Sequence, residues 1–324
     1  MGNPVCLVSG SSSGIGTAIV GAFAARGYDV VVHYNSGSDA SDPRGHKQPG
    51  AERAAAVAEK LQAECGVEAL CLGADLSQPE AAFGLVDRAY VHFGRLDIVI
   101  SNSGVTNFVR GADGQIARYR FTETPVDHLE RELDRAISVN LKGAYRLCQR
   151  SLKYMIEQAE AEREVGEEVG HRSFLFIATV SDVAPDSMRI PYGVSKAGLN
   201  HVVLGAAFEG GRHNITVNAL RPGVVETPLT SRPSGLVDPL TNQEYTVAET
   251  YGLMAEGGSQ AMSRIGQPED IAGAAFAFTQ IPYMTGQLIA VDGGFTLVNG
   301  FPNRELFLQE GMRRRSEQGD DHER

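Results

Sequence analysis

The sequence predicts an α/β fold: a doubly wound parallel sheet in a single domain with enlarged loops. Residues 5–9 form a short apolar run of strand type, residues 10–16 are rich in glycine and serine, and residues 17–27 have the pattern of a helix ending at a glycine. Strand, glycine turn and helix in this order are typical of the first unit of such a sheet. The later run 173–179 is almost entirely apolar, as expected of a central parallel strand covered on both faces.

The remaining elements follow in order along the chain. Further strands are expected at 29–34, 68–74, 96–100, 214–220 and 287–291, and helices at 51–64, 79–93, 125–149, around 191–199 and at 268–280. Three polar segments, 38–50, 106–121 and 230–263, are expected to be surface loops. After the last strand the composition becomes charged and poor in apolar residues, so we expect a folded domain at 1–302 and a partly disordered tail at 303–324.

The composition of the chain excludes several classes of function. A net charge of −11 disfavours nucleic acid and anionic membranes as partners. The four cysteines, Cys6, Cys65, Cys71 and Cys148, form no Cys-x-x-Cys pair and no Cys/His cluster of zinc spacing, so no metal site is expected. No signal peptide precedes the first strand and no apolar run is long enough to span a bilayer, which favours a cytoplasmic location.

The glycine-rich turn is a candidate site for the pyrophosphate of a nucleotide. Gly10 permits the tight turn, and Gly14 and Gly16 let backbone approach a ligand and let the helix pack on the strand. Free N–H groups at the start of a helix favour a phosphate group. The residues expected to line this site are Gly10, Ser12, Ser13, Gly14, Ile15 and Gly16. An ordinary strand-to-helix turn is the alternative interpretation.

A tyrosine and a lysine form the candidate proton-transfer pair. Tyr192 and Lys196 are four residues apart, so on a helix they lie on one face about one turn from each other. A nearby ammonium lowers the pKa of a phenol, which can then exchange a proton with a carbonyl oxygen or an alcohol. Taken alone, the same spacing is typical of a half-buried tyrosine beside a solvated lysine.

Together, these residues resemble the short-chain dehydrogenase/reductase family, and in particular its β-ketoacyl-carrier-protein reductase-like members. The family's glycine motif is Thr-Gly-x-x-x-Gly-x-Gly, in which Ser9 here replaces the threonine, and its Tyr-x-x-x-Lys motif is matched by Tyr192 and Lys196. The resemblance covers residues 4 to 301. It implies a Rossmann fold, an NAD(P) cofactor and assembly as a homo-oligomer, either tetramer or dimer.

The resemblance also implies roles for residues outside the two motifs. Asn140 would hold a water that links Lys196 to solvent, and Thr179, at the family's serine position thirteen residues before the tyrosine, would orient the substrate. Ser181 is the alternative for that hydroxyl. Lys196 would also hold the nicotinamide ribose beside Tyr192. The remaining cofactor contacts implied are Asp75 and Leu76 at the adenine, Asn102, Ser103 and Gly104 at its ribose, and Pro222, Gly223, Val225 and Thr227 at the nicotinamide.

The end of the second strand bears on the choice between NADP(H) and NAD(H). Tyr34 takes the position where NAD-preferring relatives carry an aspartate, which binds the ribose hydroxyls and repels a 2′-phosphate. Asn35 is neutral, and Ser12 and Ser13 in the glycine turn can reach such a phosphate. NADP(H) is therefore favoured over NAD(H), although no arginine marks the phosphate site.

The function expected is NADP(H)-dependent reduction of a ketone to a secondary alcohol, or the reverse, by hydride transfer. The alternatives are an NAD-dependent alcohol or sugar dehydrogenase and a catalytically silent nucleotide-binding protein on the same scaffold. Segments 106–121 and 230–263 would select the small-molecule substrate, the second at the place of the family's substrate lid. Neither carries a recognisable motif, so the sequence identifies neither the substrate nor the physiological direction.

Overall fold

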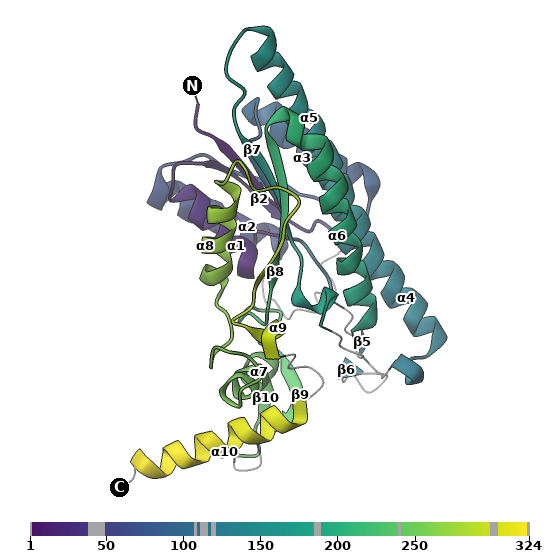
Figure 1. Ribbon diagram of the computed structural model, residues 1–324, viewed down its shortest axis with the longest axis vertical. Helices are drawn as coiled ribbons and strands as arrows, with labels where there is room; N and C mark the ends of the chain where they lie inside the picture. The colour runs from purple at the N-terminus through teal and green to yellow at the C-terminus, as the bar shows by residue number, and fades with distance from the viewer. Residues whose placement is uncertain are drawn as a thin grey trace.

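A seven-stranded sheet organises the molecule (Figure 1). The structure, a computed structural model, describes residues 2–37, 49–106, 109–110, 116–117, 121–184, 189–238, 241–298 and 304–322. Across the sheet the strands run in the order β11, β8, β7, β4, β1, β2, β3, and each neighbouring pair is parallel. Their bounds are β1 (Val5–Val8), β2 (Asp29–Tyr34), β3 (Ala69–Gly73), β4 (Ile98–Ser101), β7 (Arg172–Ile177), β8 (Ile215–Pro222) and β11 (Leu288–Val291).

The strand order reverses at β1, which lies between β2 and β4. In an open parallel sheet, this reversal leaves a crevice at the carboxyl ends of the strands, because the connecting helices leave in opposite directions. The expected doubly wound sheet is confirmed, and the predicted strands agree with the observed ones to within two residues.

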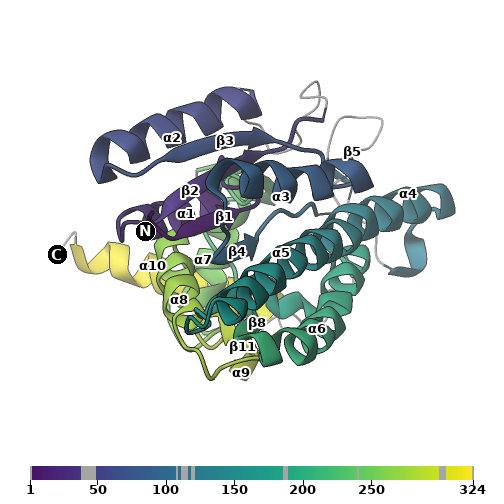
Figure 2. The same cartoon turned by 90° about the horizontal axis from the view of Figure 1, so that it is seen from above.

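Six helices cover the two faces of the sheet (Figure 2). One layer consists of α3 (Pro79–Phe93), α5 (Ala144–Glu164) and α6 (Ile190–Gly210), and the other of α1 (Gly14–Ala24), α2 (Gly50–Cys65) and α8 (Pro268–Thr279). Side chains of β1 alternate between the layers: Leu7 packs with the first, whereas Cys6 and Val8 pack with the second. All three are fully buried, so the sheet carries a hydrophobic core on each face.

Smaller elements gather beyond the carboxyl ends of the strands (Figure 1). They are β5 (Val109–Arg110), β6 (Ile116–Ala117), η2 (Phe121–Glu123), α4 (Val126–Ala136), η3 (Ile137–Gly143), η4 (Val180–Asp182), β9 (Pro233–Val237), β10 (Glu244–Thr246), α7 (Val247–Glu256), α9 (Phe295–Val298) and α10 (Arg304–His322). A short turn, η5 (Gly211–His213), follows α6 at the opposite edge. No helix in the described ranges combines the length and the apolar character required to cross a bilayer.

Three sequence expectations differ from the structure. The helix expected at 125–149 is instead α4, a π-helical segment η3 and α5, which continues to Glu164. The expected loop 230–263 contains an antiparallel hairpin and the helix α7. The polar tail, expected to be partly disordered, forms α10, because its few apolar side chains, including Phe307, pack against α7. Of the expected loop 38–50, residues 38–48 lie outside the described residues.

Candidate active site

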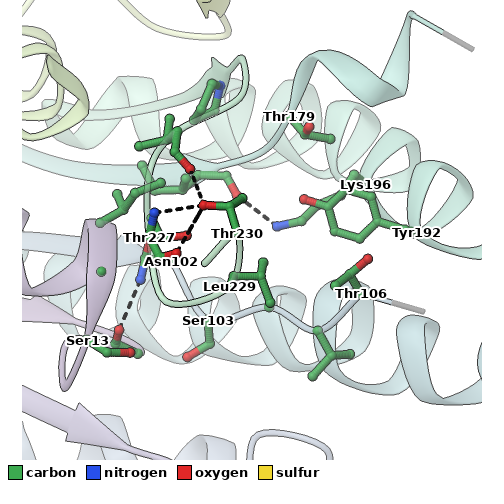
Figure 3. Close-up of a pocket in the computed structure, with 18 of the residues that line it drawn as sticks. Ser13, Asn102, Ser103, Thr106, Thr179, Tyr192, Lys196, Thr227, Leu229 and Thr230 are labelled. Carbon is green, nitrogen blue, oxygen red and sulfur yellow. Dashed lines mark hydrogen bonds between the residues drawn. The ribbon is translucent and has the colours of Figure 1, made fainter. Parts of the chain in front are cut away.

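A cavity of about 440 Å³ opens at the carboxyl edge of the sheet (Figure 3). Its lining includes residues that lie within two positions after six of the seven strands, among them Gly10 after β1, Asn102 after β4, Ala178 after β7 and Gly223 after β8. The carboxyl ends of parallel strands meet at one edge, so segments far apart in sequence converge here. Among the described residues, no cluster of histidine, cysteine or carboxylate side chains has the arrangement of a metal site.

The glycine turn forms one wall of the cavity. Gly10 and Gly14 have φ values of +68° and +58°, which side chains disfavour. Gly16 is packed so closely that a Cβ there would overlap the carbonyl oxygen of Gly10. Ser13 caps α1 without a side-chain hydrogen bond to the helix, so the first N–H groups of α1 stay available to a ligand. Of the residues predicted here, Gly10, Ser12, Ser13, Gly14 and Ile15 line the cavity, and Gly16 packs beneath them.

Asn102 and Ser9 join the turns that follow β1 and β4. The amide nitrogen of Asn102 donates to the carbonyl oxygens of Ser9 (3.1 Å) and Gly10 (3.2 Å). In return, the hydroxyl of Ser9 accepts hydrogen bonds from the backbone N–H groups of Asn102 and Ser103, both at 3.0 Å. The serine that replaces the family's threonine therefore supplies the hydroxyl that holds these turns together.

His33 lines the cavity, and the sequence analysis did not predict it there. Its Nδ1 accepts a hydrogen bond from the N–H of Gly10 (2.8 Å), so Nε2 carries the proton and donates to the carbonyl oxygen of Ala74 (3.1 Å). Burial lowers the pKa of His33 to about 4, which keeps the ring neutral. Strand alternation could have indicated this position, because residues 33 and 35 point to the same side of β2.

The residues predicted to contact the adenosine half of the cofactor at the ends of β2 and β3 do not all line the cavity. Asn35, Asp75 and Leu76 line the cavity. Tyr34 does not: its ring packs over Gly73 in the neighbouring strand, where a Cβ would lie 2.7 Å from the ring. Asp75 also accepts a hydrogen bond from the N–H of Ser77 (3.0 Å), so it shapes the turn after β3 as well.

Tyr192, Lys196 and Thr179 lie together on one side of the cavity (Figure 3). Burial raises the pKa of the Tyr192 phenol, while the charge of Arg189 and a hydrogen bond with Thr179 act in the opposite direction. The influence of Lys196 on this phenol stays a prediction. Thr179 also accepts a hydrogen bond from the N–H of Ser181 (3.2 Å), and both hydroxyls line the cavity.

Lys196 is almost completely buried. Its ammonium donates to the carbonyl oxygen of Ile177 (2.8 Å), at the end of β7. Burial lowers the pKa of Lys196 to about 8, and the buried carboxylate of Asp182 opposes this effect. Asp182 in turn accepts a hydrogen bond from Nε of Arg221 (2.8 Å). A Cβ on Gly104 would lie 3.6 Å from the ammonium, so this glycine leaves room for the lysine.

Asn140 lies in the π-helical segment η3 and connects three elements. Its amide nitrogen donates to the carbonyl oxygen of Val105 (2.8 Å) and to the hydroxyl of Ser195 (3.0 Å), and its oxygen accepts from the N–H of Val105 (2.7 Å). Insertions of this kind interrupt α-helices at functional sites. Asn140 therefore connects the loop after β4 to the helix that carries Tyr192 and Lys196.

The turn after β8 forms the remaining wall, and all four predicted residues of this turn, Pro222, Gly223, Val225 and Thr227, line the cavity. Thr230, which was not predicted, organises the turn: its hydroxyl accepts from the N–H of Thr227 (2.9 Å) and donates to the carbonyl oxygen of Val225 (3.0 Å). Three arginines that no sequence motif indicated, Arg135, Arg189 and Arg232, also line the cavity.

Comparison with known proteins agrees with this geometry. A family model described as Enoyl-(Acyl carrier protein) reductase matches residues 10–296. The chain is 29% identical to L-rhamnose 1-dehydrogenase (NAD(P)(+)) of Sphingomonas sp. (strain SKA58), over 89% of this chain and 94% of that protein. It is 28% identical to the 3-oxoacyl-[acyl-carrier-protein] reductase of Staphylococcus aureus, over 89% and 96% of the two chains.

The fold has close counterparts among solved structures. A short-chain dehydrogenase/reductase from Serratia marcescens BCRC 10948 superposes with a TM-score of 0.67 at 26% identity, covering 91% of this chain and 98% of that one. The family model spans most of the chain, and the relatives match along nearly their whole length. The resemblance expected from the sequence is thus confirmed, and the chain belongs to the short-chain dehydrogenase/reductase family of oxidoreductases.

Proposed function

We propose that this protein is an NADP(H)-dependent oxidoreductase that reduces a ketone to a secondary alcohol, or catalyses the reverse reaction. The observation that carries the proposal is the meeting of Tyr192, Lys196 and Thr179 in the cavity that also contains the glycine turn. Two relatives are named as a dehydrogenase and a reductase, which supports the same class of reaction.

The residues of the cavity fit a dinucleotide. The left-handed glycines and the uncapped start of α1 suit a pyrophosphate, because they offer backbone N–H groups without side chains in the way. Asp75 and Leu76 would hold the adenine, Asn102 its ribose, and Thr227 the nicotinamide carboxamide. When bound, the nicotinamide ring supplies or accepts the hydride.

The preference for NADP(H) is supported by the absence of a carboxylate after β2. Residues 34–37 are Tyr, Asn, Ser and Gly, and of these Asn35 lines the cavity. A 2′-phosphate would therefore meet a neutral amide at the end of β2 and the hydroxyls of Ser12 and Ser13 in the glycine turn. NAD(H) is the alternative, and comparing the dissociation constants of NADPH and NADH distinguishes the two.

Tyr192 is the proton donor in the reducing direction. Because burial raises its pKa, the phenol keeps its proton at neutral pH and can transfer it to the carbonyl oxygen as negative charge develops there. Thr179, which shares a hydrogen bond with this phenol, would orient the same oxygen, with Ser181 as the alternative. Lys196 and Asn140 would return a proton to the phenol from solvent.

The test is Tyr192→Phe, which removes the hydroxyl and keeps the ring. The rate of NADPH-dependent ketone reduction should fall at least the 10²- to 10⁴-fold typical of losing a general acid, while NADPH still binds. Tyr283→Phe is the matched control, because that side chain is fully exposed and outside the cavity. A Tyr192→Phe enzyme that retains its activity would refute the assignment.

Assembly as a homo-oligomer is part of the proposal. Helices α5 and α6 carry exposed apolar side chains, namely Tyr145, Val194, Leu204 and Phe208, the last 81% exposed. Exposed apolar groups on adjacent helices are a common basis for subunit contacts. Light scattering on the wild-type protein should find a tetramer or a dimer. Phe208→Asp should shift the oligomeric state towards smaller species. A monomeric wild-type protein would contradict the proposed assembly.

A further inference from the structure

The charge of the cavity is opposite to that of the protein. The chain has a net charge of −11, yet the described residues that line the cavity include Lys196 and three arginines, Arg135, Arg189 and Arg232. The carboxylate among these lining residues is Asp75, which follows β3 near the edge of the sheet. Among the described lining residues, positively charged side chains thus outnumber carboxylates, and this balance favours a negatively charged ligand.

Arg189 belongs to the reacting end of the cavity. It immediately precedes α6, three residues before Tyr192, and its charge acts on the phenol of that tyrosine. Its guanidinium also donates a hydrogen bond to the hydroxyl of Tyr251 (3.3 Å), which lies on α7. Arg189 therefore bridges the catalytic helix and the helix that covers the cavity, close to where a substrate carbonyl would be reduced.

The other two arginines also line the cavity. The carbonyl oxygen of Arg232 accepts a hydrogen bond from the N–H of Val247 (2.9 Å), at the first residue of α7. Arg135 is near the end of α4, one turn before Val139, which also lines the cavity. Guanidinium groups pair with carboxylate and phosphate in a planar, often bidentate geometry, so they suit oxyanions better than other ligands.

Thr106 provides an independent indication of a ligand. Its side chain is 6% exposed, and its hydroxyl has no hydrogen-bond partner in the described part of the chain. Figure 3 shows it in the pocket beside Tyr192. A buried hydroxyl without a partner is destabilising unless a bound molecule supplies one. The cavity thus has a buried polar group beside Tyr192 that a ligand can bind.

We propose that the substrate is a carbonyl compound carrying an oxyanion, a carboxylate or a phosphate, which Arg189 binds with Arg232 and Arg135 contributing charge. This inference rests on the proposed carbonyl reduction at Tyr192. Under this inference, the ionised group of the substrate lies close enough to the carbonyl being reduced for the side chain of Arg189 to bind it. Arg189 is then a residue that determines substrate specificity.

The experiment compares pairs of ketones that differ in charge. NADPH oxidation is followed with 4-oxopentanoate against its methyl ester, and with dihydroxyacetone phosphate against dihydroxyacetone. At least one charged member should show a kcat/KM at least tenfold above that of its neutral partner, and the pair that does so distinguishes carboxylate from phosphate. High salt should reduce the preference, because screening weakens attraction between charges.

Variants of Arg189 test whether this residue causes the preference for the charged ketone. Arg189→Gln should lower kcat/KM for the preferred anion at least tenfold more than it lowers kcat/KM for the neutral partner, and the difference should arise mainly through KM. Arg189→Lys should restore part of the loss, because it restores the charge without the planar fork. Arg131→Gln, on the exposed face of α4 outside the cavity, is the matched control and should leave both values unchanged.

A binding measurement separates this inference from the proposed function. Calorimetry on the NADP⁺ complex records binding of each probe, independently of turnover. Selective binding of an anionic probe that Arg189→Gln removes, without turnover of any ketone, would refute the reductase proposal and leave the inferred anion site. Equal binding and turnover of charged and neutral members in both pairs, or binding of neither anion, would overturn the inference.

Discussion

The two ends of the cavity are built in different ways. At the glycine end, small residues and backbone make the contacts, and the turn after β1 is closed by Ser9 and Asn102 with bonds of 3.0 to 3.2 Å. At the lid end, formed by α7, the side chains of Val247 and Tyr251 line the cavity. Helix α7 packs against α10, a helix about 60 residues further along the chain.

Helix α7 is supported by contacts with α10. Arg315 pairs with Glu256 at the end of α7, at 2.6 and 2.7 Å, while Phe307 packs against the buried cluster around Tyr251 and Met254. The two helices approach so closely that a Cβ on Gly311 would overlap the carbonyl of Leu253. The comparison teaches that the glycine end is held together by backbone groups and short side chains, whereas the lid end depends on packing and charge pairing between two helices.

The largest effect is expected at the glycine end, from Gly16→Ala. The added methyl group would overlap the Gly10 carbonyl and lie 2.6 Å from the amide nitrogen of Asn102, so the turn must open. Overpacking of this kind costs about 1–3 kcal/mol, and NADPH affinity should fall at least a hundredfold. Gly21→Ala is the control, because on the same helix its nearest neighbour is 3.9 Å away. Unchanged cofactor affinity in Gly16→Ala would show that the turn is not rigid.

A second effect at this end depends on pH and involves His33. Its folded pKa of about 4 lies below the ordinary value of 6.5, so the unfolded chain binds a proton first as the pH falls. The stability from the neutral ring is complete above pH 6.5 and is lost between 6.5 and 4, about 2–3 kcal/mol by pH 4.5. His33→Asn keeps a donor and an acceptor but does not titrate.

Urea unfolding at pH 7 and 4.5 measures this contribution directly. The loss of stability between the two pH values should be smaller in His33→Asn than in the wild-type protein by that amount. Other groups titrate equally in both proteins and cancel in the difference. Identical acid sensitivity of the two would mean that His33 does not bind the Gly10 N–H as a neutral ring.

The smallest effect is expected at the lid end, from Gly311→Ala. The methyl group pushes α10 away from α7, so α7 should cover the cavity less well. KM for the ketone should rise about three- to tenfold, with NADPH affinity unchanged, because the two ends are built separately. Gly252→Ala on α7 is the control, since nothing lies within 4 Å of its added Cβ. A parallel loss of NADPH affinity would show that the two ends are coupled.

Much of the glycine end could be predicted because its lining residues stand at fixed places next to strands. The glycine turn and the residues after β4 and β8 line the cavity as expected, since each directly follows a strand whose apolar pattern is clear. Of the residues predicted at the end of β2, Asn35 lines the cavity and Tyr34 does not, because alternation along the strand directs His33 to the cavity and Tyr34 onto Gly73.

The sequence by itself determined the doubly wound sheet, the glycine turn and the Tyr192–Lys196 pair, because these depend on local periodicity and on spacing within one turn or helix. Tertiary structure alone decided that Arg135, Arg189 and Arg232 line one cavity, and that a polar tail becomes the helix supporting α7. Both result from contacts between segments distant in the chain, and a pattern within one segment does not record which other segment will pack against it.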